Sequence, residues 1–373
     1  MSENKAAPGR YTVIPFGPQH PALPEPIHLR FLVDEDRIVD VVPNLGYVHR
    51  GIERACELND YKRNLFLCER VCGICNFAHG VTYCEAIEKV TDTEVPPRAR
   101  YLRVIWSELQ RLHSHLLWIG CFSDAIGFES LFMQSWRDRE IVLSLNEKTN
   151  GHRIHLETNA IGGVRKDMDD SLIGVYREDL ALLRKRIDAL RPVIHKDAGI
   201  RKKCEGKGVI PKDKARFLGA VGPTIRGSGI GDDIRLTGYE AYGELDFEPV
   251  VYDGGDAYSR LLVRFDEMYA SLDLIENAFK QMPEGPTLSK NERFPDGSAI
   301  VRTEPPRGEL FYYVEGNGTN KLSRCKIRTP TMANIPPLVS ALVGNEVPDI
   351  PTIVHSIDPC ISCTERYVNV VHE

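Results

Sequence analysis

Apolar residues recur at steps of three and four along three long stretches of the chain, which is the pattern of helices with one buried face. These stretches cover residues 102–119, 172–194 and 261–279. A further helix is predicted near 129–148, and Pro192 is expected to end or kink the helix that contains it. Such stripes are typical of a hydrophobic core rather than of a cofactor site. The sequence therefore predicts a bundle of long helices.

Shorter segments on either side of the helices alternate between apolar and polar residues, as strands do. Residues 27–42 read as two short strands joined by a DED turn, a β-hairpin, and residues 298–330 alternate enough for a second small sheet. The helical pattern dominates 51–200 and returns at 256–282, whereas the stretch 201–258 is rich in glycine and charge and predicts loops. We expect a mainly α fold (α+β), a long-helix bundle with small N-terminal and C-terminal β-sheets.

The composition mainly excludes certain classes of protein. No repeat or clear linker divides the chain, so one domain over residues 1–373 is expected. The chain has 47 Lys and Arg against 53 Asp and Glu, and 42% of its residues are apolar, which is ordinary for a globular protein and does not favour nucleic acid as a partner. The longest apolar run, Leu116–Phe122, is far shorter than the roughly 20 residues of a membrane span. The start, MSENKAAPGR, lacks the apolar core of an export signal.

Ten cysteines are the unusual feature of the composition. Without an export signal they are expected to be reduced thiols, kept for metal binding or catalysis. Cys72/Cys75 and Cys360/Cys363 form two C-x-x-C pairs at opposite ends of the chain. Thiolates suit nickel, iron and zinc, but the pairs of a zinc ribbon lie only about 15–20 residues apart. The sequence therefore predicts a fold that brings the two ends of the chain together around one buried metal centre. The second pair of ligands belongs to a C-terminal metal-binding motif at 355–366.

The residues around the pairs suit a reactive ion. If Cys75 opens a helix, His79 falls one turn further along the same face, within reach of the site. Asp358 precedes the second pair and Arg366 follows it. Each of these residues, taken alone, is explained equally well as a surface charge, a cap or a turn.

The other six cysteines show no spacing typical of a second cluster. We interpret them as buried small hydrophobes. No second cysteine set then remains for an iron–sulfur relay, so electrons would have to cross to a partner chain. These six are Cys56, Cys68, Cys84, Cys121, Cys204 and Cys325.

The two motifs RVCGIC-x3-H and DPC-x-x-C-x-x-R resemble the paired signatures of nickel–iron hydrogenase large subunits. The segments GPQHPALPEP, YVHRGIER, SHLLWIG, ETNAIGGVRKDM and EPPRGE resemble the energy-converting, membrane-associated branch, and also the related quinone-site subunit of complex I. That relative generally lacks the four metal cysteines, and all four are present here. The resemblance covers most of the chain and points to a working hydrogenase subunit.

The resemblance implies the roles of the four thiolates. They would hold nickel, with Cys72 and Cys360 as terminal ligands and Cys75 and Cys363 also bridging to iron. The iron of this family keeps carbon monoxide and cyanide ligands that the protein does not encode. Such a Ni–Fe centre is the cofactor that the resemblance implies.

The resemblance also implies the residues that handle protons. Cys360 would take the first proton from dihydrogen, and it then needs a carboxylate within hydrogen-bond reach. Glu25 matches the family's proton-transfer glutamate. Arg307 matches the arginine that overhangs the open metal position, Asp358 a carboxylate close to it, and His79 a hydrogen-bond donor to a bridging sulfur.

Two features depart from the family pattern. Glu53 resembles a ligand of a structural magnesium ion, but the usual histidine partner would fall at Arg366, and arginine does not bind cations. Many relatives carry a longer C-terminal tail that a protease removes, whereas only YVNVVHE follows Arg366.

Two other interpretations stay open from the residues alone. Cys68, Cys72 and Cys75 spell the C-x3-C-x2-C signature of radical S-adenosylmethionine enzymes, which would need repeated strand–helix units and would leave the second pair unexplained. A non-enzymatic electron-transfer or coupling subunit of the same fold would hold a structural metal or none. A measurement of nickel and iron would distinguish such a subunit from a hydrogenase.

The expected function is that of the catalytic subunit of a nickel–iron hydrogenase, which interconverts dihydrogen with protons and electrons. The resemblance implies a small subunit with an iron–sulfur cluster, ferredoxin-type redox partners and integral membrane subunits that translocate ions. It places the chain peripherally, on the cytoplasmic side of the membrane.

Overall fold

The computed structural model describes residues 11–23, 25–290 and 292–364. Arg366 and the end of the predicted C-terminal motif lie outside these ranges. None of the helices in the described ranges combines the length and apolarity that a membrane span requires.

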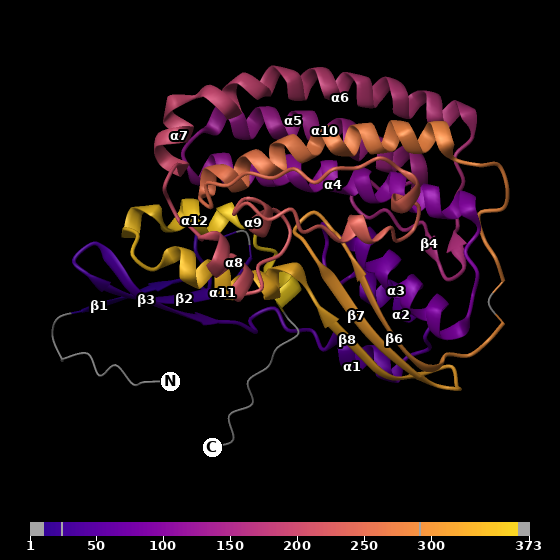
Figure 1. Ribbon diagram of the computed structural model, residues 1–373. Coiled ribbons are helices and arrows are strands. Elements are labelled where there is room, and N and C mark those ends of the chain that lie inside the picture. Colours follow the sequence, from indigo (N-terminus) through magenta and orange to yellow (C-terminus); the bar gives the residue numbers. More distant parts are fainter. Residues whose placement is uncertain (1–10, 24, 291, 365–373) are drawn as a thin grey trace.

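Four long helices form the upper layer of the molecule in Figure 1: α4 (Pro97–Ala125), α5 (Glu129–Asn150), α6 (Asp170–Lys196) and α10 (Ala257–Gln281). They pack against one another, α4 against α5 and α10, and α6 against α5 and α10. Their apolar stripes face inward and form the main hydrophobic core, because burying such a stripe is what stabilises an amphipathic helix. The predicted long-helix bundle is confirmed. Pro192 lies inside α6, which continues to Lys196, so this proline does not end the helix.

A small antiparallel sheet of strands β1 (Thr12–Phe16), β2 (His28–Asp34) and β3 (Arg37–Asn44) lies at the N-terminal end of the chain, in the order β1-β2-β3. Strands β2 and β3 match the predicted hairpin segment, but β1 was not predicted. Its sequence, TVIPF, contains Pro15, which weakens a strand prediction. A proline is tolerated on an edge strand because its missing N–H faces away from the ladder.

A second antiparallel sheet lies near the C-terminal end, with strands β6 (Asp296–Thr303), β7 (Leu310–Asn317) and β8 (Leu322–Arg328). Helix α3 (Asn76–Thr91) covers β6 and β7, and α1 (Ile52–Leu58) packs on β8. Alternate residues of β7 are buried under these helices. The mainly α fold with two small terminal sheets is therefore confirmed.

The glycine-rich stretch 201–258 is not all loop. It contains short helices and 3-10 turns, such as the helix that ends before Gly227. The remaining elements are α2 (Asn64–Glu69), β4 (Asn159–Ala160), β5 (Gly163–Val164), α7 (Ala198–Cys204), α8 (Lys212–Phe217), α9 (Pro223–Arg226), α11 (Pro330–Leu342), α12 (Ile350–Ser356), and the 3-10 turns η1 (Ile234–Thr237), η2 (Tyr242–Glu244), η3 (Val347–Asp349) and η4 (Ile361–Thr364).

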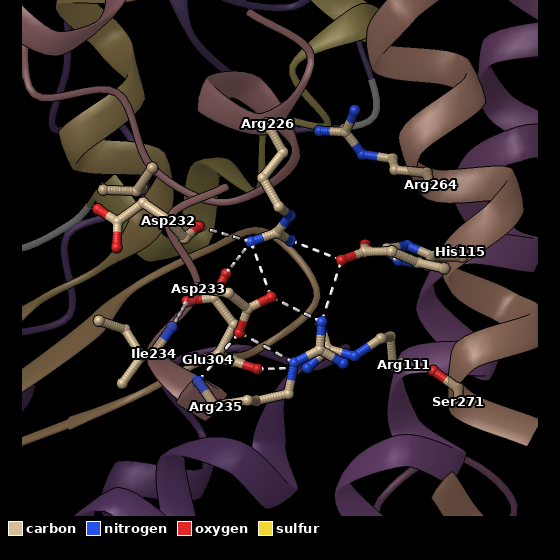
Figure 2. A network of polar contacts seen from close by, with 12 residues as sticks. Arg111, His115, Arg226, Asp232, Asp233, Ile234, Arg235, Arg264, Ser271 and Glu304 are labelled. Atoms are coloured by element: carbon tan, nitrogen blue, oxygen red, sulfur yellow. Dashed lines mark hydrogen bonds and ion pairs between the residues drawn. The ribbon is translucent and has the colours of Figure 1, made fainter. Parts of the chain in front are cut away.

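A network of buried charges joins the helix bundle to the loops beneath it (Figure 2). Arg226 is 2.6 Å from Glu267 and 2.8 Å from Glu304, and Arg235 is 3.1 Å from Glu267. Although burial opposes ionisation, Arg226 and a hydrogen bond from His115 hold the pKa of Glu267 well below its usual range. The members, all nearly without solvent exposure, are Glu108, Arg111, His115, Arg226, Asp233, Arg235, Glu267 and Glu304.

Replacing Glu267 by glutamine is expected to lower the free energy of unfolding by about 3 kcal/mol, because it leaves buried guanidinium charges without their counter-charge. Glu276→Gln, on the same helix α10, is the matched control. Glu276 pairs with Arg177 at the partly exposed surface, where an ion pair contributes about 0–1 kcal/mol. Chemical denaturation measures the free energy of unfolding of the two variants. An equal decrease in both would contradict the proposed importance of the network.

Candidate metal centre

The structure brings the two C-x-x-C pairs together in the core. Cys72 follows α2 and Cys75 is the N-cap of α3, whereas Cys360 and Cys363 follow α12 at the other end of the chain. The Sγ atom of Cys360 lies 3.4 Å from that of Cys72 and 3.2 Å from that of Cys363. Cys75 belongs to the same buried cluster, and its backbone N–H donates to the Cys72 sulfur at 3.1 Å. The sulfurs of Cys72, Cys360 and Cys363 all lie within 4.8 Å of one another, a spacing at which they can share a metal ion, and Cys75 lies beside this group.

The neighbouring thiols shift one another's pKa values. Hydrogen bonds from Cys360, Cys363 and Cys75, against the effect of burial, hold the pKa of Cys72 well below its usual range. Contact with Cys72 and burial raise the pKa of Cys75, and similar contacts with burial raise that of Cys363. The set therefore favours one thiolate among buried thiols until a cation replaces the protons.

Arg307 supplies positive charge next to the sulfurs. It lies in the loop between β6 and β7, and its Nη1 donates to the Cys75 sulfur at 3.1 Å. Its Nε donates to the Asp358 carbonyl at 2.9 Å and its Nη2 to Asp358 Oδ1 at 2.8 Å. Asp358 adopts a left-handed backbone conformation, with φ of 56°, which turns the chain toward Cys360. The ion pair between Arg307 and Asp358 thus holds the second C-x-x-C motif next to the first.

A cavity of about 330 Å³ opens beside Cys360. Glu25, Arg307 and Asp358 line it together with apolar side chains such as Leu117 and Trp118. The second carboxylate oxygen of Asp358, Oδ2, is buried and accepts no hydrogen bond from the described residues. The cavity therefore offers a small, mostly apolar chamber with a few polar groups at its metal-facing end.

Glu25 reaches the site from the loop that precedes β2. Its Oε2 accepts a hydrogen bond from the Ser362 backbone N–H at 2.9 Å, and its Oε1 accepts one from the Ser362 hydroxyl. Ser362 lies between the two cysteines of the second motif. Glu25 is half-buried, and it lines the cavity beside Cys360.

His79 lies one turn into α3, because Cys75 is the N-cap of that helix, and the backbone N–H of His79 donates to the Cys75 carbonyl. Its ring Nδ1 lies 2.8 Å from the Tyr312 hydroxyl on β7. The helix start is as the sequence indicated. The donation from His79 to a bridging sulfur stays a prediction.

Glu53 lies apart from the thiols, in a setting that does not fit magnesium. Its Oε1 accepts from the Ile327 backbone N–H at 2.9 Å and its Oε2 lies 3.2 Å from the Lys326 ammonium. Magnesium would compete with a lysine for the same oxygen, and its octahedral shell demands further oxygen ligands. The expected magnesium role of Glu53 is therefore not supported, and its usual partner position, Arg366, lies outside the described residues.

The charge network that supports the Arg307 loop was missed from the sequence. Arg111 donates to the Glu304 carbonyl at 2.5 Å, and Arg226 holds the Glu304 carboxylate. Glu304 lies three residues before Arg307. The available signal was the interruption of the apolar stripes of α4 and α10 by charged residues such as Arg111 and Glu267, which are buried only when they are paired.

The six remaining cysteines differ from one another. Cys84 and Cys204 are buried as predicted, whereas Cys121 is only half-buried and lines the cavity. The sulfurs of Cys56, Cys68 and Cys325 gather in a separate buried group. Cys68 thus lies with a different partner set from Cys72 and Cys75, which removes the radical S-adenosylmethionine interpretation.

Two family profiles match the chain. The profile described as "Respiratory-chain NADH dehydrogenase, 49 Kd subunit" matches residues 125–294 and 288–366, and the profile "Nickel-dependent hydrogenase" matches residues 50–122. The first covers more than half of the chain. The second covers the segment with the first C-x-x-C pair.

Individual relatives come from the same two groups of proteins as the profiles. The carbon monoxide-induced hydrogenase of Rhodospirillum rubrum is 41% identical over 95% of this chain and 99% of its own length. The membrane-bound hydrogenase subunit alpha of Pyrococcus furiosus is 39% identical over 96% of this chain and 88% of its own length. A chain in the structure of an archaeal membrane-bound sulfane sulfur reductase superposes with a TM-score of 0.91 at 30% identity, over 97% of this chain and all of that chain. This protein therefore belongs to the family that joins the large subunits of nickel-dependent hydrogenases to the 49 kDa subunit of respiratory NADH dehydrogenase.

Proposed function

We propose that this chain is the catalytic subunit of an energy-converting nickel–iron hydrogenase, which oxidises dihydrogen and reduces protons reversibly. The observation that carries the proposal is the convergence of four cysteine sulfurs from the two ends of the chain beside a small cavity. A fold retained only for a quinone site, or for coupling, has no need of four such thiols.

The residues present fit a Ni–Fe centre. Cys72 and Cys360 would be terminal nickel ligands, and Cys75 and Cys363 would bridge to iron. When bound, the centre supplies a Lewis acid that polarises dihydrogen for heterolytic cleavage. Arg307 lines the cavity and would donate hydrogen bonds to a cyanide ligand of the iron.

Protons would leave through the protein. Cys360 and Glu25 line the same cavity, and Ser362 holds both carboxylate oxygens of Glu25. Glu25 is therefore oriented as the base that takes a proton from the Cys360 sulfur and passes it toward solvent. A half-buried carboxylate with fixed orientation suits this transfer.

The proposal includes partners in a membrane complex. Two of the relatives are named as membrane-bound proteins, and we propose the same peripheral, cytoplasmic-side attachment to integral ion-translocating subunits. Electrons would pass to a small subunit with an iron–sulfur cluster and from there to ferredoxin.

The test uses the complex purified with its natural partner chains. About one nickel per chain, infrared bands of carbon monoxide and cyanide, and exchange between D2 and protons are expected. Zinc alone at the four cysteines, or no exchange from a nickel-loaded complex, would overturn the proposal. Reduction of ferredoxin by dihydrogen then checks the proposed electron acceptor separately.

A further inference from the structure

A second group of thiols lies away from the proposed nickel centre, between α1, α2 and β8. It contains Cys56 of α1, Cys68 of α2 and Cys325 of β8. Their three Sγ atoms all lie within 4.8 Å of one another, and those of Cys56 and Cys68 are 3.8 Å apart. All three side chains are fully buried.

These distances suit a single ion. Three thiolates at about 2.3 Å from one zinc ion stand about 3.8 to 4.0 Å apart. The ligands of an iron–sulfur cluster bind different irons and are therefore spread more widely. The group could close on one ion through small side-chain adjustments, without a change in the packing of its three elements.

The buried side chain of Asn64 contacts the backbone of one of these cysteines. The Asn64 side chain is fully buried, and its Nδ2 donates to the Cys56 carbonyl at 2.6 Å. Its Oδ1 has no hydrogen-bond partner among the described residues. Asn64 also lies one turn before Cys68 on α2. A buried acceptor without a donor is costly, and a metal ion, or water bound to one, would satisfy it.

The rest of the surroundings is mainly apolar, with the Tyr83 phenol and the Glu53 carboxylate as polar neighbours. Leu65, Val314 and Ile327 belong to the same hydrophobic cluster as the three cysteines. Burial, together with contacts to Cys325 and Cys56, raises the pKa of Cys68, which favours the protonated thiol of Cys68 in the absence of metal. An apolar pocket with soft sulfur donors favours a thiophilic ion over magnesium or calcium.

We propose that Cys56, Cys68 and Cys325 bind one thiophilic d10 ion, Zn²⁺ or Cu⁺, as a structural site separate from the nickel centre. Each thiol gives its proton to solvent as its metal–sulfur bond forms, and no group is oxidised or reduced. The ion would join α1 and α2 to β8. Because α2 leads directly into the Cys72 loop, the site would also hold the start of the first nickel-binding motif.

The experiment compares zinc and copper per chain in three purified complexes: the wild type, a variant with Cys56, Cys68 and Cys325 all changed to serine, and Cys84→Ser. Cys84 is fully buried in the same hydrophobic cluster but belongs to neither thiol group, so it controls for the loss of a buried thiol. About one equivalent of zinc or copper is expected in the wild type and in Cys84→Ser, and it should be lost in the triple variant. Which of the two metals is lost identifies the ion.

X-ray absorption at the zinc or copper edge of the wild-type complex keeps the test decisive if the triple variant fails to fold. A shell of three sulfurs at about 2.3 Å supports the proposal. Equal zinc and copper in the wild type and the triple variant, a metal shell without three sulfurs, or a disulfide between any two of the three cysteines would each overturn it. These results do not depend on hydrogenase activity, so they stand apart from the test of the proposed function.

Discussion

Cys360→Ser is expected to abolish assembly of the nickel centre. Cys360 lies in contact with both Cys72 and Cys363, so it is one of the sulfurs through which the two motifs meet. A serine hydroxyl stays protonated near neutral pH and does not replace a thiolate ligand for a borderline metal. Nickel per chain, measured by mass spectrometry of the purified complex, should fall by about tenfold or more, and D2–proton exchange should fall with it.

Cys84→Ser is the matched control for this change. Cys84 is equally buried but lies outside the four-thiol group, so its variant should keep nickel and exchange activity. Near-normal nickel in Cys360→Ser would show that three sulfurs suffice and would refute the proposed ligand set. Loss of nickel in both variants would indicate a general folding defect, in which case thermal unfolding of the two separates stability from metal binding.

Glu25→Gln is expected to leave the nickel content unchanged while it lowers D2–proton exchange by about 100-fold or more, the usual size of a lost acid–base catalyst. Glutamine is nearly isosteric and still accepts a hydrogen bond from the Ser362 N–H, so the loop and the second motif should keep their positions. It cannot take a proton from the Cys360 sulfur. The exchange reaction needs no electron acceptor, so its loss reports on the proton path rather than on a partner chain.

Two further variants sharpen this experiment. Glu276 is a partly buried glutamate near the end of α10, where it pairs with Arg177 of α6. The variant Glu276→Gln should keep full exchange. Glu25→Asp retains a proton acceptor on a shorter arm and should recover part of the rate. Full exchange in Glu25→Gln, with nickel at the wild-type level, would remove Glu25 from the mechanism.

The candidate metal ligands were predictable because their signal is local. A C-x-x-C spacing is visible within four residues, and the chemistry of thiolates indicates a metal whatever the fold. The long helices were predictable for a similar reason, since periodic apolar positions in α4, α6 and α10 specify a buried face. Strand β1 was not, because Pro15 is acceptable only once the strand is known to lie at an edge.

Relations between distant segments required the tertiary structure. Glu25 in a proline-rich loop is an ordinary surface carboxylate until the fold sets it against Ser362. The interaction of Glu267 with Arg226 is equally invisible in the sequence, because the two residues are 41 positions apart and Arg226 does not belong to α10. Glu53 shows another case, because its contacts with Lys326 and Ile327 become visible only in the fold, while its predicted magnesium role stays a prediction.

The sequence by itself determined the helix bundle, the four candidate ligands and the family. Only the tertiary structure decided that the ligands from the two chain ends meet, that a cavity with Glu25 and Arg307 opens beside them, and that Cys56, Cys68 and Cys325 form a second thiol group. The physical reason is that periodicity and short motifs report interactions between near neighbours in the chain. Metal sites and charge networks depend on which distant segments the burial of the apolar faces brings together.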